Sequence, residues 1–393
     1  MNKVCKSFLI ILYVFFVLIT FNTYVHAETE IPEKAQETPE KALKRIYNIR
    51  NKAFTTENLL SIKDCYDSSH KFGIWALDHE VRRIKYLKYW SNERKIKFIN
   101  VESSIKVKKV SVSGIKATLA LEESYKFDYI YFEDEPFIVN SFGVGLRHGV
   151  RMILKNGNWI IYNDWYTDCF EDAISRYNGD IPQGLMNEIE FGINNNILNK
   201  YIVTNNSLKT KSYNREKAMK YADKYCGVAW GSGNEFKYNK IYQDFNGIGG
   251  DCTNYVSQVL GDKKEGGGIP FGGSWNCEYR KNDKAQGSKA WVNADGLKDY
   301  LISSGKGTII KKGTFKELYF NDINVEPAIN KLKLGDLIAY EKKGDIDHFA
   351  VITGRDSRGY ALINSHTTDR YHVPWDLGWG DKWIKFHLIR INY

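Results

Sequence analysis

Alternation of apolar and polar residues dominates the chain between about residues 96 and 162. Residues 96–107, 111–121, 125–132 and 150–162 alternate at every second position, which predicts four β-strands. Gly143, Gly145 and Gly149 break the pattern, so we expect them to separate the last two strands. The segment Lys155-Asn156-Gly157-Asn158 predicts a tight turn. Before these strands, apolar residues at helical spacing predict a helix over residues 39–62.

The second half of the chain mixes helical and strand periods. Asn214 is a suitable N-cap for a helix that follows it. A second helix opens at Cys252, because Tyr255, Val256, Val259 and Leu260 form one apolar stripe. A third extends to Leu301. Strands are expected over residues 334–340, 348–353 and 360–366.

The order of elements in the first half, a helix followed by a curved antiparallel sheet, resembles the cone-shaped NTF2-like α+β fold. The resemblance rests mainly on the closing strand, residues 157–165, and covers residues 38–175. It implies a pocket or an interaction module. We expect His148, Asp164 and Asp168 to be isolated surface residues, without an acid–base role.

The N-terminus has the three parts of a secretory signal. Lys3 and Lys6 precede an apolar run over residues 8–21, and small residues follow up to Ala27. We therefore expect cleavage of residues 1–27, linkers over 28–37 and 176–212, and a mature protein that is secreted and associated with the cell wall. An uncleaved anchor is the alternative, but the run is short for a full span. No stable membrane insertion is expected after cleavage.

The net charge of +9 favours anionic surfaces such as wall polymers or lipid head groups, but the lysines are scattered, so a simply solvated basic surface explains it better than a dedicated patch. Nucleic acid is not an expected partner outside the cell. Removal of the signal leaves five cysteines, so at least one thiol stays free unless it pairs between chains. One arrangement of these five cysteines is two disulfides plus one free thiol that acts as a nucleophile. The pairing among Cys65, Cys169, Cys226 and Cys277 is left open.

Cys252 has the sequence context of a nucleophile. Gly249 and Gly250 allow a sharp turn, and the cysteine then stands in the first turn of a helix. Unpaired N–H groups and the helix dipole at that position favour a thiolate. About ninety residues later, His348 opens a strand and offers a base.

A third polar residue is expected to orient this base. Strand alternation places His348 on one face of its strand, and it places Asn364 and His366 together on the returning strand. If hairpin pairing brings these faces together, either residue can hold the imidazole tautomer.

The second half also resembles the bacterial putative amidase domain, a family akin to the NlpC-type papain-like peptidases. The resemblance rests on residues 250–258 (Gly-Asp-Cys-Thr-Asn-Tyr-Val-Ser-Gln), 288–291, 335–338, 347–348 and 365–367, in the family's order. It implies a papain-like (NlpC-type) α+β domain over residues 213–393. It also implies that Cys252 is the nucleophile, that His348 is the base, and that His366, or else Asn364, is the third member.

The hydrogen-bond donors that would stabilise an oxyanion are less clearly indicated by the sequence than the nucleophile and the base. The Cys252 N–H is one candidate, and Asn246 stands before the cysteine at roughly the spacing of the papain-like glutamine. We group Asp251 and Trp291 with Asn246 as oxyanion or substrate candidates. Trp275, Trp291 and Trp375 either floor a cleft or belong to the core.

The sequence thus predicts a secreted α+β cysteine amidase that hydrolyses amide bonds, with the peptides of peptidoglycan as the expected substrate. It needs no cofactor and no metal. An acyl transferase on the same fold and a non-catalytic wall-binding protein are the alternatives. A zinc hydrolase using Cys252, His348 and His366 is less favoured, since paired metal-ligand spacings are missing from the sequence.

Overall fold

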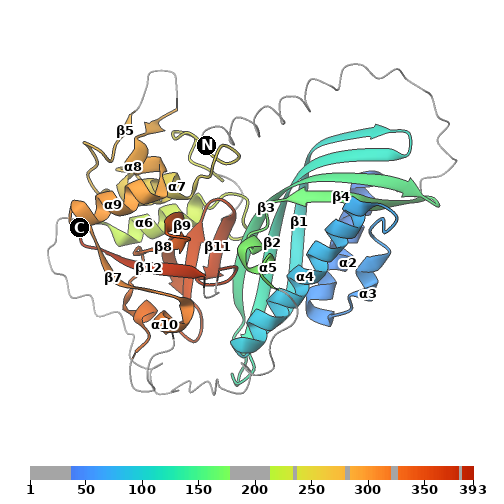
Figure 1. Cartoon of the computed structure of the whole chain (residues 1–393), viewed down its shortest axis with the longest axis horizontal. Coiled ribbons are helices and arrows are strands. Elements are labelled where there is room, and N and C mark those ends of the chain that lie inside the picture. Colours follow the sequence, from blue (N-terminus) through green and yellow to red (C-terminus); the bar gives the residue numbers. More distant parts are fainter. Residues whose placement is uncertain (1–36, 178–212, 233–236, 279–283, 320–325, 380–382) are drawn as a thin grey trace.

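A computed structural model describes residues 37–177, 213–232, 237–278, 284–319, 326–379 and 383–393. The expected signal sequence and nearly all of the second linker lie outside these ranges. Ten strands form one antiparallel sheet in the order β1-β2-β3-β11-β10-β9-β8-β12-β7, with β4 paired to β3. The helices of the two halves form separate groups on this sheet (Figure 1). The α+β class is confirmed.

The N-terminal region contributes one end of the sheet and the helices that cover it. Helix α2 begins as expected, with Pro39 in its first turn and Thr38 accepting a hydrogen bond from the Lys41 N–H at 3.4 Å. The elements in chain order are α2 (Pro39–Thr56), α3 (Leu60–Lys63), α4 (Lys71–Glu93), β1 (Ile96–Ser113), β2 (Lys116–Tyr131), β3 (Asn140–Lys155), β4 (Asn158–Tyr166) and α5 (Glu171–Ile174).

The strand boundaries differ from the expected ones. Gly114 turns the chain between β1 and β2 with φ of 54°, so the strand expected over residues 111–121 is a hairpin. Gly143, Gly145 and Gly149 lie inside β3 instead of between strands. The tight turn is confirmed, because Asn156 and Gly157 both have positive φ and join β3 to β4.

Helix α4 has no counterpart among the sequence-based predictions. Its buried face contains Ala76 and Leu87, but also His79, Glu80 and Arg83. Buried polar residues interrupt the apolar stripe by which a helix is recognised in a sequence.

A charged network occupies the interior between these helices and the sheet, and it corrects the expectation of isolated surface residues. His148 Nδ1 lies 2.9 Å from Asp164 Oδ1, and its Nε2 lies 3.2 Å from Glu123 Oε2. Asp168 forms an ion pair with the Arg83 guanidinium, with 2.9 Å between Oδ2 and Nε. Burial opposes protonation of His148, but the Asp164 and Glu123 carboxylates raise its pKa to about 9. Each charge is buried because it has a partner distant in the sequence.

The C-terminal region places α7 and α9 against one face of β8 and β9. Leu337, Ala339, Phe349 and Val351 point to that face, and the alternate residues point to the core shared with the N-terminal region. The Asn214 cap is confirmed by a 2.9 Å hydrogen bond from the Lys217 N–H. The elements are α6 (Arg215–Lys224), α7 (Cys252–Gly261), β5 (Cys277–Glu278), β6 (Gln286–Gly287), α8 (Lys289–Val292), α9 (Ala294–Ser303), β7 (Gly307–Gly313), α10 (Phe315–Tyr319), a 3₁₀ turn (Ala328–Lys331), β8 (Leu337–Lys342), β9 (Asp345–Arg355), β10 (Ala361–Ser365), β11 (Asp369–Pro374) and β12 (Ile384–Ile391).

The two regions join where β11 pairs with β3. Asp369 is opposite Gly145, and Tyr371 is opposite Gly143. A Cβ atom on Gly143 would lie 2.1 Å from the Trp230 carbonyl oxygen, and one on Gly145 would lie 2.6 Å from backbone atoms of the same segment. These glycines are needed because residues 228–230 lie directly on the strand.

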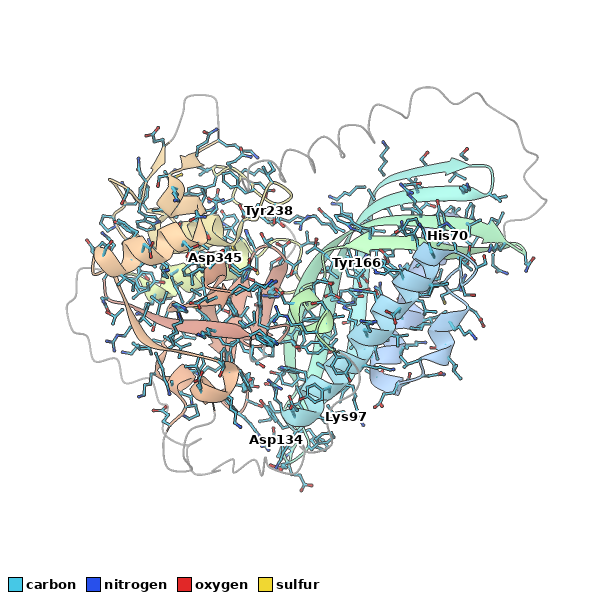
Figure 2. All side chains as sticks on the ribbon, in the orientation of Figure 1. His70, Lys97, Asp134, Tyr166, Tyr238 and Asp345 are labelled. Carbon is cyan, nitrogen blue, oxygen red and sulfur yellow. The ribbon has the colours of Figure 1, made fainter. Side chains whose placement is uncertain are left out.

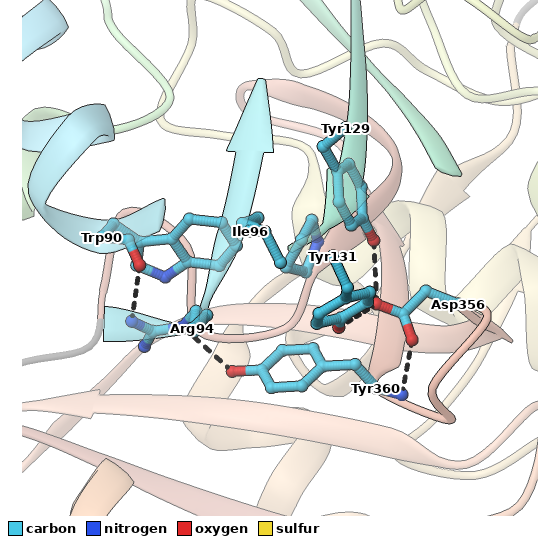
Figure 3. Close-up of a pocket in the computed structure, with 8 residues that line it drawn as sticks. Trp90, Arg94, Ile96, Tyr129, Tyr131, Asp356 and Tyr360 are labelled. Atoms are coloured by element: carbon cyan, nitrogen blue, oxygen red, sulfur yellow. Dashed lines mark hydrogen bonds between the residues drawn. The ribbon is translucent and has the colours of Figure 1, made fainter. Parts of the chain in front are cut away.

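Buried carboxylates hold a second part of this junction. Asp376 pairs with Arg94 and accepts from the Trp90 indole N–H at 2.9 Å. Asp356 accepts hydrogen bonds at 3.0 and 2.6 Å from two tyrosine hydroxyls of β2. Figure 3 shows the small pocket at this place, lined by Trp90, Arg94, Ile96, Tyr129, Tyr131, Asp356, Tyr360 and Pro374.

The cysteines of the described ranges are all free and buried: Cys65, Cys169, Cys226, Cys252 and Cys277. The arrangement of two disulfides plus one thiol is therefore not present. Within the same ranges, no helix combines the length and the apolar character that crossing a membrane requires.

Candidate functional site

Cys252 is the first residue of α7, as expected, and Asp251 precedes it at the N-cap position. Its side chain is buried. The Sγ atom lies 3.8 Å from Thr253 Oγ1 and is hydrogen-bonded by the backbone N–H of Phe349 in β9. The thiol is therefore held between the start of a helix and the middle of the sheet.

The protonation state of this thiol differs from the expectation. Burial raises the pKa of Cys252, and the N–H of Phe349 and the hydroxyl of Thr253 lower it only in part. Desolvation of the thiolate outweighs the donors at the helix start. The resting site thus contains a neutral thiol, which needs a base to become a nucleophile.

His348 supplies an imidazole in the state that a base requires. Its ring lies 5.3 Å from Trp379 in a stacked arrangement and 5.4 Å from Tyr340. Burial lowers the pKa of His348, and the charges of Arg370 and His366 lower it further. Its Nε2 atom has no hydrogen-bond partner among the described residues. The ring is therefore neutral, and Nε2 is unengaged.

Cys252 and His348 approach the same segment of β9 from different sides. The thiol contacts the backbone of Phe349, the residue directly after His348. Tyr340 and Trp379, which surround the imidazole, belong to the core on the face away from α7. Within the described residues, no hydrogen bond joins Sγ to the imidazole.

His366 is a doubly hydrogen-bonded cation. Its Nδ1 lies 2.6 Å from Asp251 Oδ2, and its Nε2 lies 2.6 Å from the Tyr225 carbonyl oxygen. Both neighbours are acceptors, so both ring nitrogens must carry a proton. Burial disfavours this charge, but Asp251 raises the pKa of His366, and Asp369 adds to the effect. The ring also stacks on Tyr255 with 4.0 Å between centroids.

Asn364 lies on the α7 side of the sheet. It pairs with Val351 across a register shift between β9 and β10. Its amide accepts from the Thr353 hydroxyl at 2.8 Å and donates to Asp223 at 2.9 Å. Neither Asn364 nor His366 hydrogen-bonds to His348 within the described residues. The common face expected for these side chains is thus not formed, because the register shift changes which face β10 presents.

Asp251 links the cysteine to its surroundings. Its Oδ1 accepts from the Phe245 N–H at 3.0 Å and from the Asn254 amide at 2.8 Å, while Oδ2 holds His366. Its own N–H donates to Thr367 Oγ1 at 2.6 Å. Asp251 therefore fixes the loop that leads to Cys252.

The remaining candidates form no hydrogen bond with Cys252 within the described residues. Asn246 is partly exposed, and its backbone and amide N–H groups both donate to Asp244 Oδ1, at 2.9 and 2.8 Å. Trp291 is fully buried and donates its indole N–H to Asn254. Trp275, Trp291 and Trp375 are all fully buried and belong to the core, which was the favoured of the two alternatives. No group of three or more potential metal ligands occurs among the described residues.

One family comparison concerns the C-terminal region. Residues 212–389 match the model described as the putative amidase domain. The match covers less than half of the chain, and it makes the C-terminal region similar to that domain. The family match indicates amide hydrolysis for this region of the chain.

Other comparisons extend over different parts of the chain. The uncharacterized protein YjcM of Bacillus subtilis (strain 168) is 27% identical over 218 residues, which are 52% of this chain and 44% of that protein. The chain thus spans less than half the length of this curated relative. Similar solved structures include an NTF2-like putative dehydratase from Streptomyces avermitilis (9% identity, 32% of this chain, 94% of that chain, TM-score 0.24) and an NTF2-like protein from Shewanella oneidensis (12%, 33%, 100%, 0.20).

Sequence reasoning did not find several neighbours of Cys252 in the amidase domain. Asp251 was expected at the site, but not as the partner of His366. The signal available was its position directly before the cysteine. The roles of Tyr225 and Phe349 are carried by backbone atoms, so their side-chain identities gave no signal.

Replacing His366 with glutamine should reduce stability in a pH-dependent way. The pKa of His366 is raised in the folded protein, so its stabilisation is fully present below its unfolded value near 6.5 and is lost as pH rises through the folded pKa. The difference in free energy of unfolding between wild type and His366→Gln should therefore shrink above neutral pH. Urea denaturation over a pH series measures it. His387→Gln is the control: burial lowers the pKa of His387, so the opposite slope is expected.

Proposed function

We propose that this chain is a cysteine amidase in which Cys252 is the nucleophile and His348 is the general base. The observation that carries the proposal is the placement of a buried thiol at the first turn of α7, against the residue that follows a neutral histidine in β9. A neutral thiol beside an unprotonated imidazole is the starting state for nucleophilic catalysis with a general base.

The hydrogen bonds favour His348 over His366 as the base. A general base needs a nitrogen lone pair, and both nitrogens of His366 already donate to oxygen atoms. His348 Nε2 is unengaged among the described residues. The proposed mechanism requires the β9 segment around His348 to shift when substrate binds, because a turn of the ring alone leaves the imidazole on the face of β9 away from α7. Once it reaches Sγ, the imidazole takes the thiol proton and later gives it to the leaving amine.

The covalent step joins Sγ to the acyl carbon of the substrate and breaks its C–N bond. The amine leaves with the proton from His348, and water then cleaves the thioester to release the acid and restore the thiol. The Cys252 N–H has no acceptor four residues earlier, since it stands in the first turn, so it is available to the oxyanion. We propose Asn246 as a second donor, which requires its amide to leave Asp244.

We propose peptidoglycan peptides as the substrate and the cell wall as the place of action. The signal-like N-terminus and the net charge of +9 support this proposal, because both suit an exported protein that meets anionic wall polymers.

Digestion of purified peptidoglycan, followed by mass spectrometry, tests this substrate. Wild type should release fragments with a new free carboxylate and a new free amine, and Cys252→Ala should release none. Addition of a primary amine separates hydrolysis from acyl transfer, because a transferase would form the amide of that amine. Absence of fragments from both proteins would remove peptidoglycan as the substrate.

A further inference from the structure

Charges of alternating sign lead from the N-terminal region to the candidate nucleophile. Arg147 belongs to β3, Asp369 opens β11, His366 follows β10, and Asp251 precedes Cys252. The first pair joins the two regions: an Arg147 Nη2 atom lies 3.1 Å from Asp369 Oδ2. The second pair, His366 with Asp251, lies directly behind the cysteine.

Asp369 is a fully buried carboxylate with few partners. It accepts from the Val228 N–H at 2.9 Å, from the Tyr238 hydroxyl at 2.5 Å and from Arg147. Its other oxygen, Oδ1, has no partner among the described residues. Arg147 is the cation in contact with this carboxylate, and a buried charge without such a partner is costly.

Tyr238 connects this pair to His366. Its hydroxyl accepts a hydrogen bond from Arg147 and donates one to Asp369. Its ring packs edge-on against the His366 ring, with 4.9 Å between the centroids. Figure 2 shows Tyr238 where the C-terminal region faces the sheet of the N-terminal region. The hydroxyl fixes the tyrosine, and the tyrosine limits the movement of the imidazolium that holds Asp251.

We propose that Arg147 is a positioning residue for Cys252: by compensating the charge of Asp369 it fixes Tyr238 and His366 behind Asp251, so that the N-terminal region completes the amidase site. This inference rests on the proposed function of Cys252. It assigns the N-terminal region an indirect part in the reaction, through the position of the residues next to Cys252.

A purely structural role for Arg147 makes a different prediction. If the Arg147–Asp369 pair only held the two regions together, its loss would lower the free energy of unfolding and leave the thiol of the folded protein unchanged. In the proposed role, loss of the cation frees Tyr238 and His366, so the charge of Asp251 next to Cys252 is less well compensated, which disfavours the thiolate.

Alkylation of Cys252 by iodoacetamide separates these roles without any substrate. The rate at Cys252 is followed by peptide mass spectrometry against pH in the full chain. For Arg147→Gln we expect a higher midpoint and a rate at pH 7 lower by about 3- to 10-fold, since one pKa unit changes the thiolate fraction about tenfold. Arg147→Lys should restore most of the rate. Arg151→Gln is the matched control, because Arg151 lies four residues along β3, is exposed and has no ion pair with any described residue.

An unchanged pH profile in folded Arg147→Gln would overturn the proposal. If that variant does not fold, Tyr238→Phe decides. It keeps the ring and the Arg147–Asp369 pair, and the proposal expects a smaller shift in the same direction, whereas an unchanged profile would overturn it. Alkylation does not require turnover. A wild type without amidase activity would therefore remove the proposed function, while the alkylation profiles would still test the role of Arg147.

Discussion

Replacing Cys252 with alanine should abolish amide hydrolysis while the protein stays folded. Loss of a catalytic nucleophile costs at least about 10³-fold in kcat, because the remaining binding groups cannot form the acyl intermediate. Alanine removes only Sγ, and the position remains compatible with the first turn of α7. Release of amine from the substrate, with circular dichroism to verify folding, measures the effect.

Cys277→Ala is the control for this substitution. Cys277 is a buried, free thiol in β5, and burial raises its pKa to about 12. We expect its replacement to leave kcat within a few-fold of wild type. His348→Gln should lose activity to a similar extent as Cys252→Ala, because the two residues act as a unit. Equal activity of Cys252→Ala and wild type would contradict the cysteine mechanism.

The second large effect concerns the charged network of the N-terminal region. An Arg50 Nη2 atom lies 2.5 Å from Glu123 Oε1, and neither side chain is exposed to solvent. Arg50→Met should lower the free energy of unfolding by about 3–5 kcal/mol, because it leaves a carboxylate buried without its main partner. Urea denaturation followed by circular dichroism measures this difference. Lys88→Met, which breaks the exposed pair with Glu57, should cost less than about 1 kcal/mol.

This effect should depend on pH through Glu123. Burial favours its neutral form, but Arg50 and His148 lower its pKa to about 2. A lowered folded pKa means that the stabilisation is present above the unfolded value near 4.5 and is lost as pH falls toward 2. The difference between wild type and Arg50→Met should therefore shrink in this range. The double variant Arg50→Met/Glu123→Leu should recover part of the lost stability, since no unpaired charge remains. A small effect of Arg50→Met at neutral pH would contradict the account of this network.

Much of the fold follows from periodicity. The stripe of Tyr255, Val256, Val259 and Leu260 predicted α7 and placed Cys252 at its start. The Asn156-Gly157 pair predicted the β3–β4 hairpin. These features are local, so a short window of sequence contains the whole signal.

The features that sequence reasoning missed depend on distant contacts. Gly143 and Gly145 looked like a break between strands, but they are strand residues over which residues 228–230 pass. Helix α4 escaped notice because its buried face includes Glu80 and Arg83, which pair with Arg50 and Asp168 outside the helix. A polar residue whose partner is far away in the sequence looks like a surface residue until the fold is known.

The candidate site likewise combines features that the local sequence predicts with features that depend on distant contacts. Sequence context singled out Cys252, His348 and His366 as candidates, but it did not predict the acceptors that surround His366. Strand alternation alone placed His366 and Asn364 beside His348, whereas the register shift in β10 turns them toward α7. The thiolate expected at Cys252 is not favoured, because burial raises the pKa of the thiol. The position at a helix start can be read from the local sequence, whereas burial depends on the whole fold.

Trapping the acyl-enzyme tests the central claim most directly. Rapid acid quenching of wild type during turnover of an amide substrate, followed by intact-protein and peptide mass spectrometry, detects a thioester if one accumulates. The account predicts a mass increase equal to the acyl group, located on Cys252 and absent from Cys252→Ala. Turnover with the acyl group on any other residue, or turnover by Cys252→Ala, would contradict it.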